Sequence, residues 1–115
     1  MRAPGLSRFL PGWLLACLIA GGQTVAAELP TYKLSIQNGR FIPETIEVPA
    51  GARFKIMVSN LGPGPEEFES YDLKKETVMN AGVTRPVVFA PLKPGIYKFF
   101  GEFHPATAKG RIVAK

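Results

Sequence analysis

The stretch Phe41–Asn60, FIPETIEVPAGARFKIMVSN, contains two short apolar segments on either side of the turn residues Pro-Ala-Gly. In the second segment Phe54, Ile56 and Val58 occupy alternate positions, and most of their neighbours are polar. Alternation with a period of two puts the apolar side chains on one face of an extended strand. The stretch therefore predicts two consecutive β-strands, each with one buried face.

Segments of the same kind lie on both sides of this stretch. They cover 31–37, 66–70, 85–91, 96–103 and 110–115, whereas 74–82 fits either a strand or one helical turn. Gly- and Pro-rich turns such as 61–65 separate them, and no amphipathic helix is visible. Short strands with regular turns are typical of sandwiches. We therefore expect an all-β fold, a Greek-key antiparallel β-sandwich of seven to eight strands.

Residues 1–27 have the features of a secretory signal peptide. Arg2 and Arg8 precede an apolar run, and small residues lead up to a cleavage point before Glu28. We expect this segment to be cleaved and the protein to be periplasmic. Two alternatives remain open, which are an uncleaved membrane anchor and a lipid anchor on Cys17.

Cleavage would leave 28–115 as one small domain without cysteine, because Cys17 is the only one in the chain. No disulfide could then stabilise it, so stability would depend on burial and sheet pairing. Without Arg2 and Arg8 the domain has twelve basic and nine acidic residues. These charges are scattered and do not alternate with aromatic residues, so we do not expect a nucleic-acid partner.

Three pieces of the sequence resemble cupredoxins. They are the pattern FxPxxIEVPAGxxFKIxVxN at 41–60, KPGIYKFFGEFH at 93–104 and KGRIVAK at 109–115. The resemblance covers 31–115 and is greatest to the EfeO-type cupredoxin-like domain. PEEFES and FFGEFHP also resemble the small periplasmic cupredoxin of Ftr-type bacterial ferrous-iron uptake systems. The resemblance implies a cupredoxin-like sandwich with a metal site between its loops.

The chain departs from the cupredoxin ligand pattern at three of four positions. The first histidine falls at Glu66 or Glu67, the cysteine at Gly101, and the methionine at 107–108. His104, the only histidine in the chain, is the retained ligand. A blue copper centre needs a thiolate. After signal cleavage the sequence therefore excludes a type 1 site.

Carboxylates take the place of the lost ligands. Glu67 and Glu69 lie on one face of the segment 66–70, with Phe68 on the other face. The topology implied by the resemblance brings acidic residues and one imidazole together, and the candidate metal ligands are Glu66, Glu67, Glu69, Glu102 and His104. Such donors suit copper(II), iron or manganese. The sequence leaves open whether they form one site or two.

Each candidate also has a plain structural explanation. The glutamates could be solvated charges that protect an edge strand, and the histidine could be a hydrogen-bonded loop residue. Met57 and Met79 are soft donors, but Met57 could be a core or an edge residue of a strand, and packing explains Met79 better than ligation does. Tyr71 and Asp72 could support the site from outside or, for the aspartate, ligate. Phe103 could cover the site or form a contact surface.

The sequence therefore supports two hypotheses about function. The first is a periplasmic cupredoxin-like protein that binds a copper or iron ion in ferrous-iron uptake, with at most a ferroxidase-like accessory role or electron relay to a membrane permease. Its partners would be periplasmic and membrane components of that system, and we also consider a homodimer. The second is a metal-free docking module with an acidic partner-binding face. An independent hydrolytic enzyme is disfavoured, because no nucleophile and base are suitably arranged.

Overall fold

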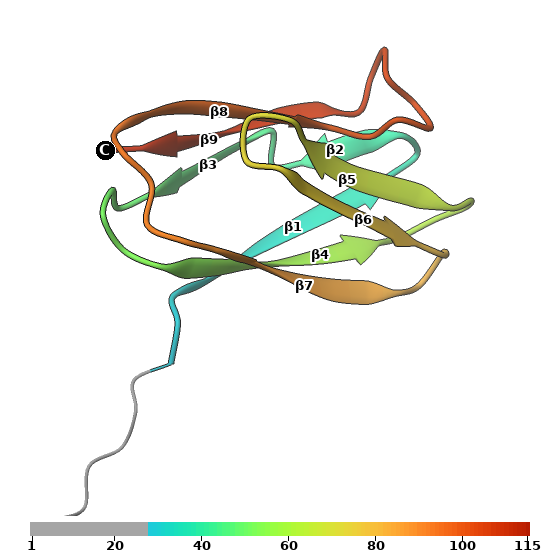
Figure 1. Cartoon of the computed structure of the whole chain (residues 1–115). Coiled ribbons are helices and arrows are strands. Elements are labelled where there is room, and N and C mark those ends of the chain that lie inside the picture. Colours follow the sequence, from blue (N-terminus) through green and yellow to red (C-terminus); the bar gives the residue numbers. More distant parts are fainter. Residues whose placement is uncertain (1–27) are drawn as a thin grey trace, which may run out of the picture.

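Nine strands and no helix make up residues 28–115, which are the residues that the computed structural model describes (Figure 1). The strands are β1 (Thr31–Gln37), β2 (Arg40–Ile42), β3 (Thr45–Val48), β4 (Phe54–Asn60), β5 (Glu66–Ser70), β6 (Lys75–Met79), β7 (Thr84–Phe89), β8 (Gly95–Phe100) and β9 (Lys109–Ala114). The predicted signal peptide, its cleavage point and Cys17 lie outside the described residues or at their boundary. Within 28–115 there is no helix long and apolar enough to cross a bilayer.

The strands form two sheets that face each other, which confirms the predicted sandwich. One sheet has the order β2-β1-β4-β7 and the other β3-β9-β8-β5-β6. Both are mixed, because β1 pairs with β4 and β3 pairs with β9 in parallel. We expected an antiparallel sandwich, and these two parallel pairs are exceptions to it. Period-two alternation is the same for both pairing directions, so the sequence pattern could not distinguish them.

The strand count is also higher than the predicted seven or eight. The extra strand is β2, three residues that pair with β1 across the Asn38–Gly39 turn. Both turn residues have positive φ, 51° and 73°. Asn-Gly is the favoured sequence for such a two-residue hairpin turn, because both residues tolerate this conformation. The ambiguous segment 74–82 contains β6, which closes a hairpin with β5.

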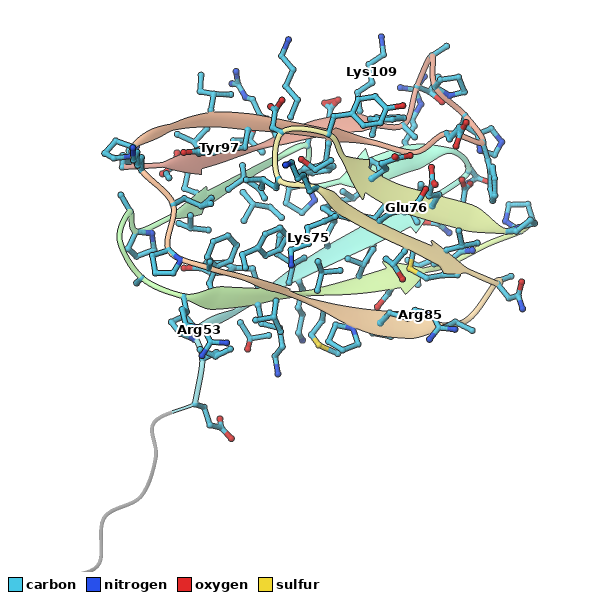
Figure 2. All side chains as sticks on the ribbon, viewed as in Figure 1. Arg53, Lys75, Glu76, Arg85, Tyr97 and Lys109 are labelled. Carbon is cyan, nitrogen blue, oxygen red and sulfur yellow. The ribbon has the colours of Figure 1, made fainter. Side chains whose placement is uncertain are left out.

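The core lies between the two sheets and is rich in phenylalanine (Figure 2). The alternating residues Phe54, Ile56 and Val58 of β4 are at most 1% exposed, as their spacing predicted. The rings of Phe54 and Phe89 stack with centroids 4.7 Å apart. Phe68 lies between the rings of Phe41, Phe89 and Phe99. Burial of one such side chain stabilises the fold by roughly 1.5–3 kcal/mol.

Candidate metal site

The predicted ligands fall on opposite faces of β5, the strand that carries three of them. Glu66 lies on the same face as Phe68 and points toward the interior end of the sandwich, where it meets His104. Glu67 and Glu69 lie on the outer face. The separation of Glu67 and Glu69 from Phe68 agrees with the predicted alternation. The structure therefore does not bring all five candidates together, but forms two groups.

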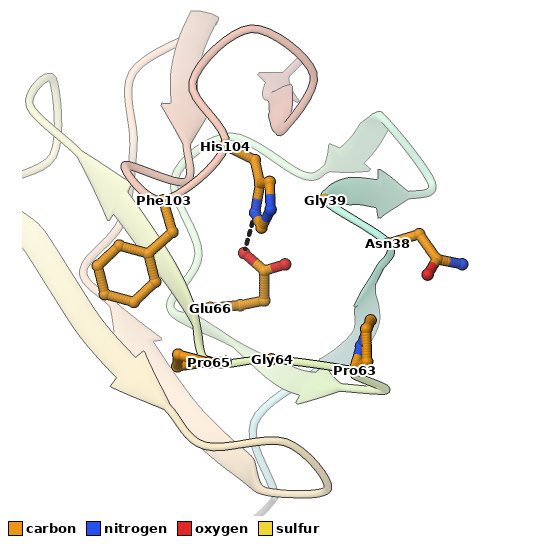
Figure 3. A pocket seen from close by; sticks show the side chains of 8 residues that line it. All are labelled: Asn38, Gly39, Pro63, Gly64, Pro65, Glu66, Phe103 and His104. Carbon is orange, nitrogen blue, oxygen red and sulfur yellow. Dashed lines mark hydrogen bonds and ion pairs between the residues drawn. The ribbon is translucent and has the colours of Figure 1, made fainter.

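The first group is the pair Glu66 and His104, shown in Figure 3. Nδ1 of His104 lies 2.9 Å from Oε1 of Glu66. The carboxylate side chain is 1% exposed, while that of the histidine is 49% exposed. Among the described residues, the other oxygen of Glu66, Oε2, is a buried side-chain atom that has no hydrogen-bond partner. A buried carboxylate oxygen without a partner is costly and calls for an explanation.

The pair lies in an open cleft of about 530 Å³ at one end of the sandwich. The cleft is formed by the Asn38–Gly39 turn, the segment Pro63–Pro65 and the loop that carries Phe103 and His104 (Figure 3). Phe103 is 46% exposed and lines the cleft. One side of the imidazole therefore faces solvent, while Glu66 reaches the cleft from within the protein.

Gly39 holds the β1–β2 turn against the histidine ring. A Cβ atom at this position would lie 2.8 Å from Cγ of His104, which is too close for any side chain. Thr107, in the same loop as His104, donates a hydrogen bond of 2.6 Å to the carbonyl oxygen of Gly39. The loop and the turn are thus joined by one contact and one hydrogen bond. Together they fix where the imidazole lies.

Asn60 shapes the opposite wall of the cleft. Its fully buried amide donates to the carbonyl oxygens of Gly64 and Met79 and accepts from the backbone N–H of Gly62. These three bonds satisfy polar groups of the Pro- and Gly-rich segment that leads into Glu66. Asn60, the last residue of β4, therefore fixes the position of the start of β5, where Glu66 lies.

The position that corresponds to the cupredoxin cysteine cannot hold a side chain. A Cβ atom on Gly101 would lie 2.8 Å from the carbonyl oxygen of Glu67 and 3.1 Å from Cβ of Ala108. Ala108, at the expected methionine position, is fully buried in the core. The neighbouring Thr107 is bonded to Gly39 instead. The residues present therefore do not fit a type 1 copper ion.

The second group is a cluster of carboxylates on the outer face of β5 and β6 and in the loop that follows β8, hereafter the acidic half. It consists of Glu67, Glu69, Glu76 and Glu102, whose oxygen atoms can all lie within 4.8 Å of one another. Oε1 of Glu67 accepts a 2.9 Å hydrogen bond from the backbone N–H of Glu102. Four carboxylates at this spacing could share a cation, and they also repel one another in its absence.

Burial and repulsion raise the pKa of two carboxyl groups of the acidic half, those of Glu67 and Glu69. Glu67 is 2% exposed, and desolvation raises the pKa of its carboxyl group to about 7, with further contributions from neighbouring carboxylates. Desolvation also raises the pKa of Glu69, as do the charges of Glu76 and Glu102. The negative charge of Glu69 raises the pKa of Tyr71. Glu67 and Glu69 therefore hold their protons more tightly than isolated glutamates would.

The remaining candidates have structural roles. Met79 is fully buried in the core, opposite Glu66 on β6, whereas Met57 is half-buried on β4. Asp72 accepts a 2.9 Å hydrogen bond from the backbone N–H of Lys98 and so attaches the β5–β6 turn to β8. Tyr71 is 72% exposed and packs edge-on against Phe100.

The sequence interpretation missed Glu76 and the cleft residues Asn38 and Gly39. Glu76 lies directly opposite Glu69 in the β5–β6 hairpin. Had the segment 74–82 been assigned as a strand, this pairing would have placed a fourth carboxylate beside the others. The Asn-Gly dipeptide was visible as a turn signal, but its contact with the loop histidine depends on the tertiary fold.

The two facing sheets, with a histidine in the loop between the last two strands, define a cupredoxin fold. A family model for the cupredoxin-like domain matches residues 10–114, and the chain belongs to that family. The chain is 38% identical over 81 residues to an uncharacterized protein of Rickettsia prowazekii (strain Madrid E). That match covers 70% of this chain and 65% of the relative.

Solved structures of similar shape are cupredoxins of low sequence identity, and they bear on the fold alone. Reduced auracyanin from Roseiflexus castenholzii superimposes with a TM-score of 0.65 at 15% identity, covering 74% of this chain and 96% of that one. Auracyanin A from Chloroflexus aurantiacus, described as a "blue" copper protein, gives a TM-score of 0.59 at 14% identity, covering 74% and 99%.

Proposed function

We propose that this chain is a periplasmic cupredoxin-like protein that binds a divalent transition-metal ion between Glu66 and His104 and hands it on within a bacterial ferrous-iron uptake system. The ion would be copper(II) or iron(II). The observation that carries the proposal is Oε2 of Glu66, which is buried beside the imidazole without a partner among the described residues. A cation in the cleft would satisfy that oxygen.

The two donors suit such an ion in type and in spacing. Imidazole nitrogen and carboxylate oxygen both bind copper(II) and iron, and copper(II) binds more strongly by the Irving–Williams order. Metal bonds to these atoms are about 2.0–2.2 Å long, so neighbouring donors at a right angle lie about 2.9 Å apart. The observed distance between Nδ1 and Oε1 is 2.9 Å. Without an ion this distance is that of a hydrogen bond, and an ion would have to replace that bond to take the two atoms as adjacent ligands.

A site with only two protein donors favours exchange over storage. The open cleft leaves room for water or for a donor from another molecule. Metal sites with open positions react and exchange, whereas closed sites are structural. This supports a role in metal transfer, with iron oxidation as an accessory step at most. The link to iron uptake rests on the resemblance of PEEFES and FFGEFHP to the cupredoxin of ferrous-iron uptake systems. The periplasmic location of the protein rests on the signal-like residues 1–27.

The test is metal titration of the purified protein by calorimetry, together with thermal melts, using copper(II), iron(II) under anaerobic conditions, manganese(II) and zinc(II). We expect one ion per chain and a higher melting temperature, because an ion that binds only the folded state stabilises it. Glu66→Gln keeps the shape of the side chain but removes its charge. This change and His104→Ala should each weaken binding by about tenfold or more.

The matched control is Glu69→Gln combined with Glu76→Gln, which removes two charges from the acidic half and leaves the cleft intact. Binding should persist in this variant. If metal binding is lost in this control variant and retained in Glu66→Gln, the ion binds the acidic half and the proposed cleft site is wrong.

The biological role has a separate test. Deletion of the gene in the producing bacterium should slow growth when iron(II) is limiting. The wild-type gene should restore growth, and Glu66→Gln should not. If the wild-type and the Glu66→Gln genes restore growth equally, any role of the protein in iron uptake does not depend on metal binding in the cleft.

The second candidate function is a docking module that works without metal. It is favoured by the acidic half, where four carboxylates gather on the outer face of one sheet. In this case none of the four metals would change the melting temperature, and a partner with a basic surface would bind instead.

A further inference from the structure

The outer face of the five-stranded sheet carries opposite charges on its two sides. The acidic half lies over β5 and β6. On β8 and β9, three basic side chains, Lys98, Lys109 and Arg111, line a groove of about 560 Å³, hereafter the basic half. Glu44 also lines this groove and offsets one of the three positive charges. Lys109 points outward from the sandwich in Figure 2.

Strand register places the two halves next to each other. Lys98 is directly opposite Arg111, and Phe100 is opposite Lys109 across β8 and β9. On its other side Phe100 is opposite Glu69. Residues that are opposite each other point to the same face of a sheet. The boundary between the two halves therefore runs along Phe100, with Tyr71 packed against its ring at 5.0 Å.

Neither half is fully neutralised by the residues that the structure describes. Among residues 28–115, the ion pairs are His104 with Glu66 and Lys115 with Glu47. None of the basic side chains of the groove is within salt-bridge distance of the acidic half. Arg111 donates through Nε to Thr45, at 3.1 Å, which holds its guanidinium group over the groove. Adjacent patches of opposite net charge therefore lie on one face, and their exposed members are Glu76, Glu102, Lys98, Lys109 and Arg111.

The same face exposes large apolar side chains. Tyr71 is 72% exposed, Ile96 57% and Val78 48%. Val78 is opposite Glu67 on β6, and Ile96 precedes Lys98 by two residues on β8, so both lie on this outer face. Apolar and aromatic side chains framed by charges are the usual composition of a protein interface.

We propose that this face is the interface of a homodimer, in which the acidic half of each copy lies on the basic half of the other. A two-fold axis parallel to β8, above the boundary at Phe100, would place the acidic half of each copy over the basic half of the other. A surface with both charges side by side is complementary to itself, as a two-fold interface requires. A partner of a single charge would instead meet repulsion over half of the face. The proposal does not depend on metal binding in the cleft.

The test is sedimentation equilibrium of the purified protein at low salt, with two charge-reversal variants. Glu69→Lys with Glu76→Lys makes the face basic, and Lys98→Glu with Arg111→Glu makes it acidic. The wild type should have the mass of a dimer, and each variant alone should have half that mass. An equimolar mixture of the two variants should again have the mass of a dimer, because their faces are complementary. High salt should dissociate the wild type, since exposed charges are screened beyond about 8 Å at physiological ionic strength.

The control is Lys33→Glu, which reverses an exposed charge on β1 in the other sheet and should leave the dimer intact. Circular dichroism of each variant checks that it folds. A wild type that stays monomeric at high concentration and low salt would overturn the proposal. So would a dimer that survives both reversals, or a mixture of folded variants that does not associate.

Discussion

At the scale of single residues, the burial of Glu67 makes the stability of the protein depend on pH. Its pKa is raised from 4.5 to about 7 mainly by desolvation, so the folded protein binds a proton that the unfolded chain releases between these values. The free energy of unfolding should therefore fall as the pH rises from 4.5 to 7, by about 1–3 kcal/mol for this group. Glu69 shifts in the same direction and adds to the fall.

Urea unfolding at a series of pH values measures this effect in the wild type and in Glu67→Gln. Glutamine cannot ionise, and its side-chain oxygen still accepts the bond from Glu102. We expect the variant to lose less stability over this pH range. Glu47→Gln on β3, where the carboxylate is exposed, is the control. Identical pH profiles for the wild type and Glu67→Gln would contradict the assignment.

The residue types of the site were predictable, but their grouping was not. Period-two alternation correctly separated Glu67 and Glu69 from Phe68. The same rule puts Glu66 on the face of Phe68, yet the expected topology placed it with the outer carboxylates as well. Which face meets His104 depends on how the last loop folds over the end of the sandwich, and no local pattern encodes that.

At the scale of elements, the β1–β2 turn supports the candidate metal site. Gly39→Ala would introduce a side chain at φ 73° and 2.8 Å from the histidine ring. Gly51→Ala is a matched control, because φ is 81° there and no atom lies within 4 Å of the new Cβ. Both changes should cost about 1–2 kcal/mol for the left-handed conformation. Only Gly39→Ala should also weaken metal binding.

Urea unfolding gives the stability loss, and calorimetric titration with copper(II) gives the affinity. A Gly51→Ala variant that also loses affinity would show that general destabilisation, and not the turn, controls the site. Unchanged affinity in Gly39→Ala would mean that the imidazole position is irrelevant to binding.

Most elements could be predicted from sequence, and the failures have identifiable causes. The strands with clear alternation, such as β1 and β4, were found nearly at their true bounds. β2 was missed because three residues carry too little pattern, and β6 stayed ambiguous because Lys74 to Met79 mixes both periods. The parallel pairing of β1 with β4 could not be predicted, because side chains alternate in the same way in parallel and antiparallel strands.

At the scale of the whole molecule, stability depends on one aromatic core that joins the sheets. Phe68 is fully buried and packs against three other phenylalanine rings. Phe68→Ala should lower the free energy of unfolding by about 3–5 kcal/mol, through lost burial and the cavity left behind. Phe103→Ala removes the same group from a 46% exposed position and should cost far less.

Equilibrium unfolding in urea compares the two variants directly. For a single small domain, the loss in Phe68→Ala should appear as a shift of one cooperative transition. Equal losses in both variants would contradict this account of the core. A separate early transition would mean that the two sheets unfold independently.

The close approach of Gly101 to the carbonyl oxygen of Glu67 also limits how this protein can evolve. The backbone occupies the space in which a cysteine side chain would have to start. A Gly101→Cys change would therefore introduce the thiolate of a blue copper protein only together with a movement of the neighbouring strand.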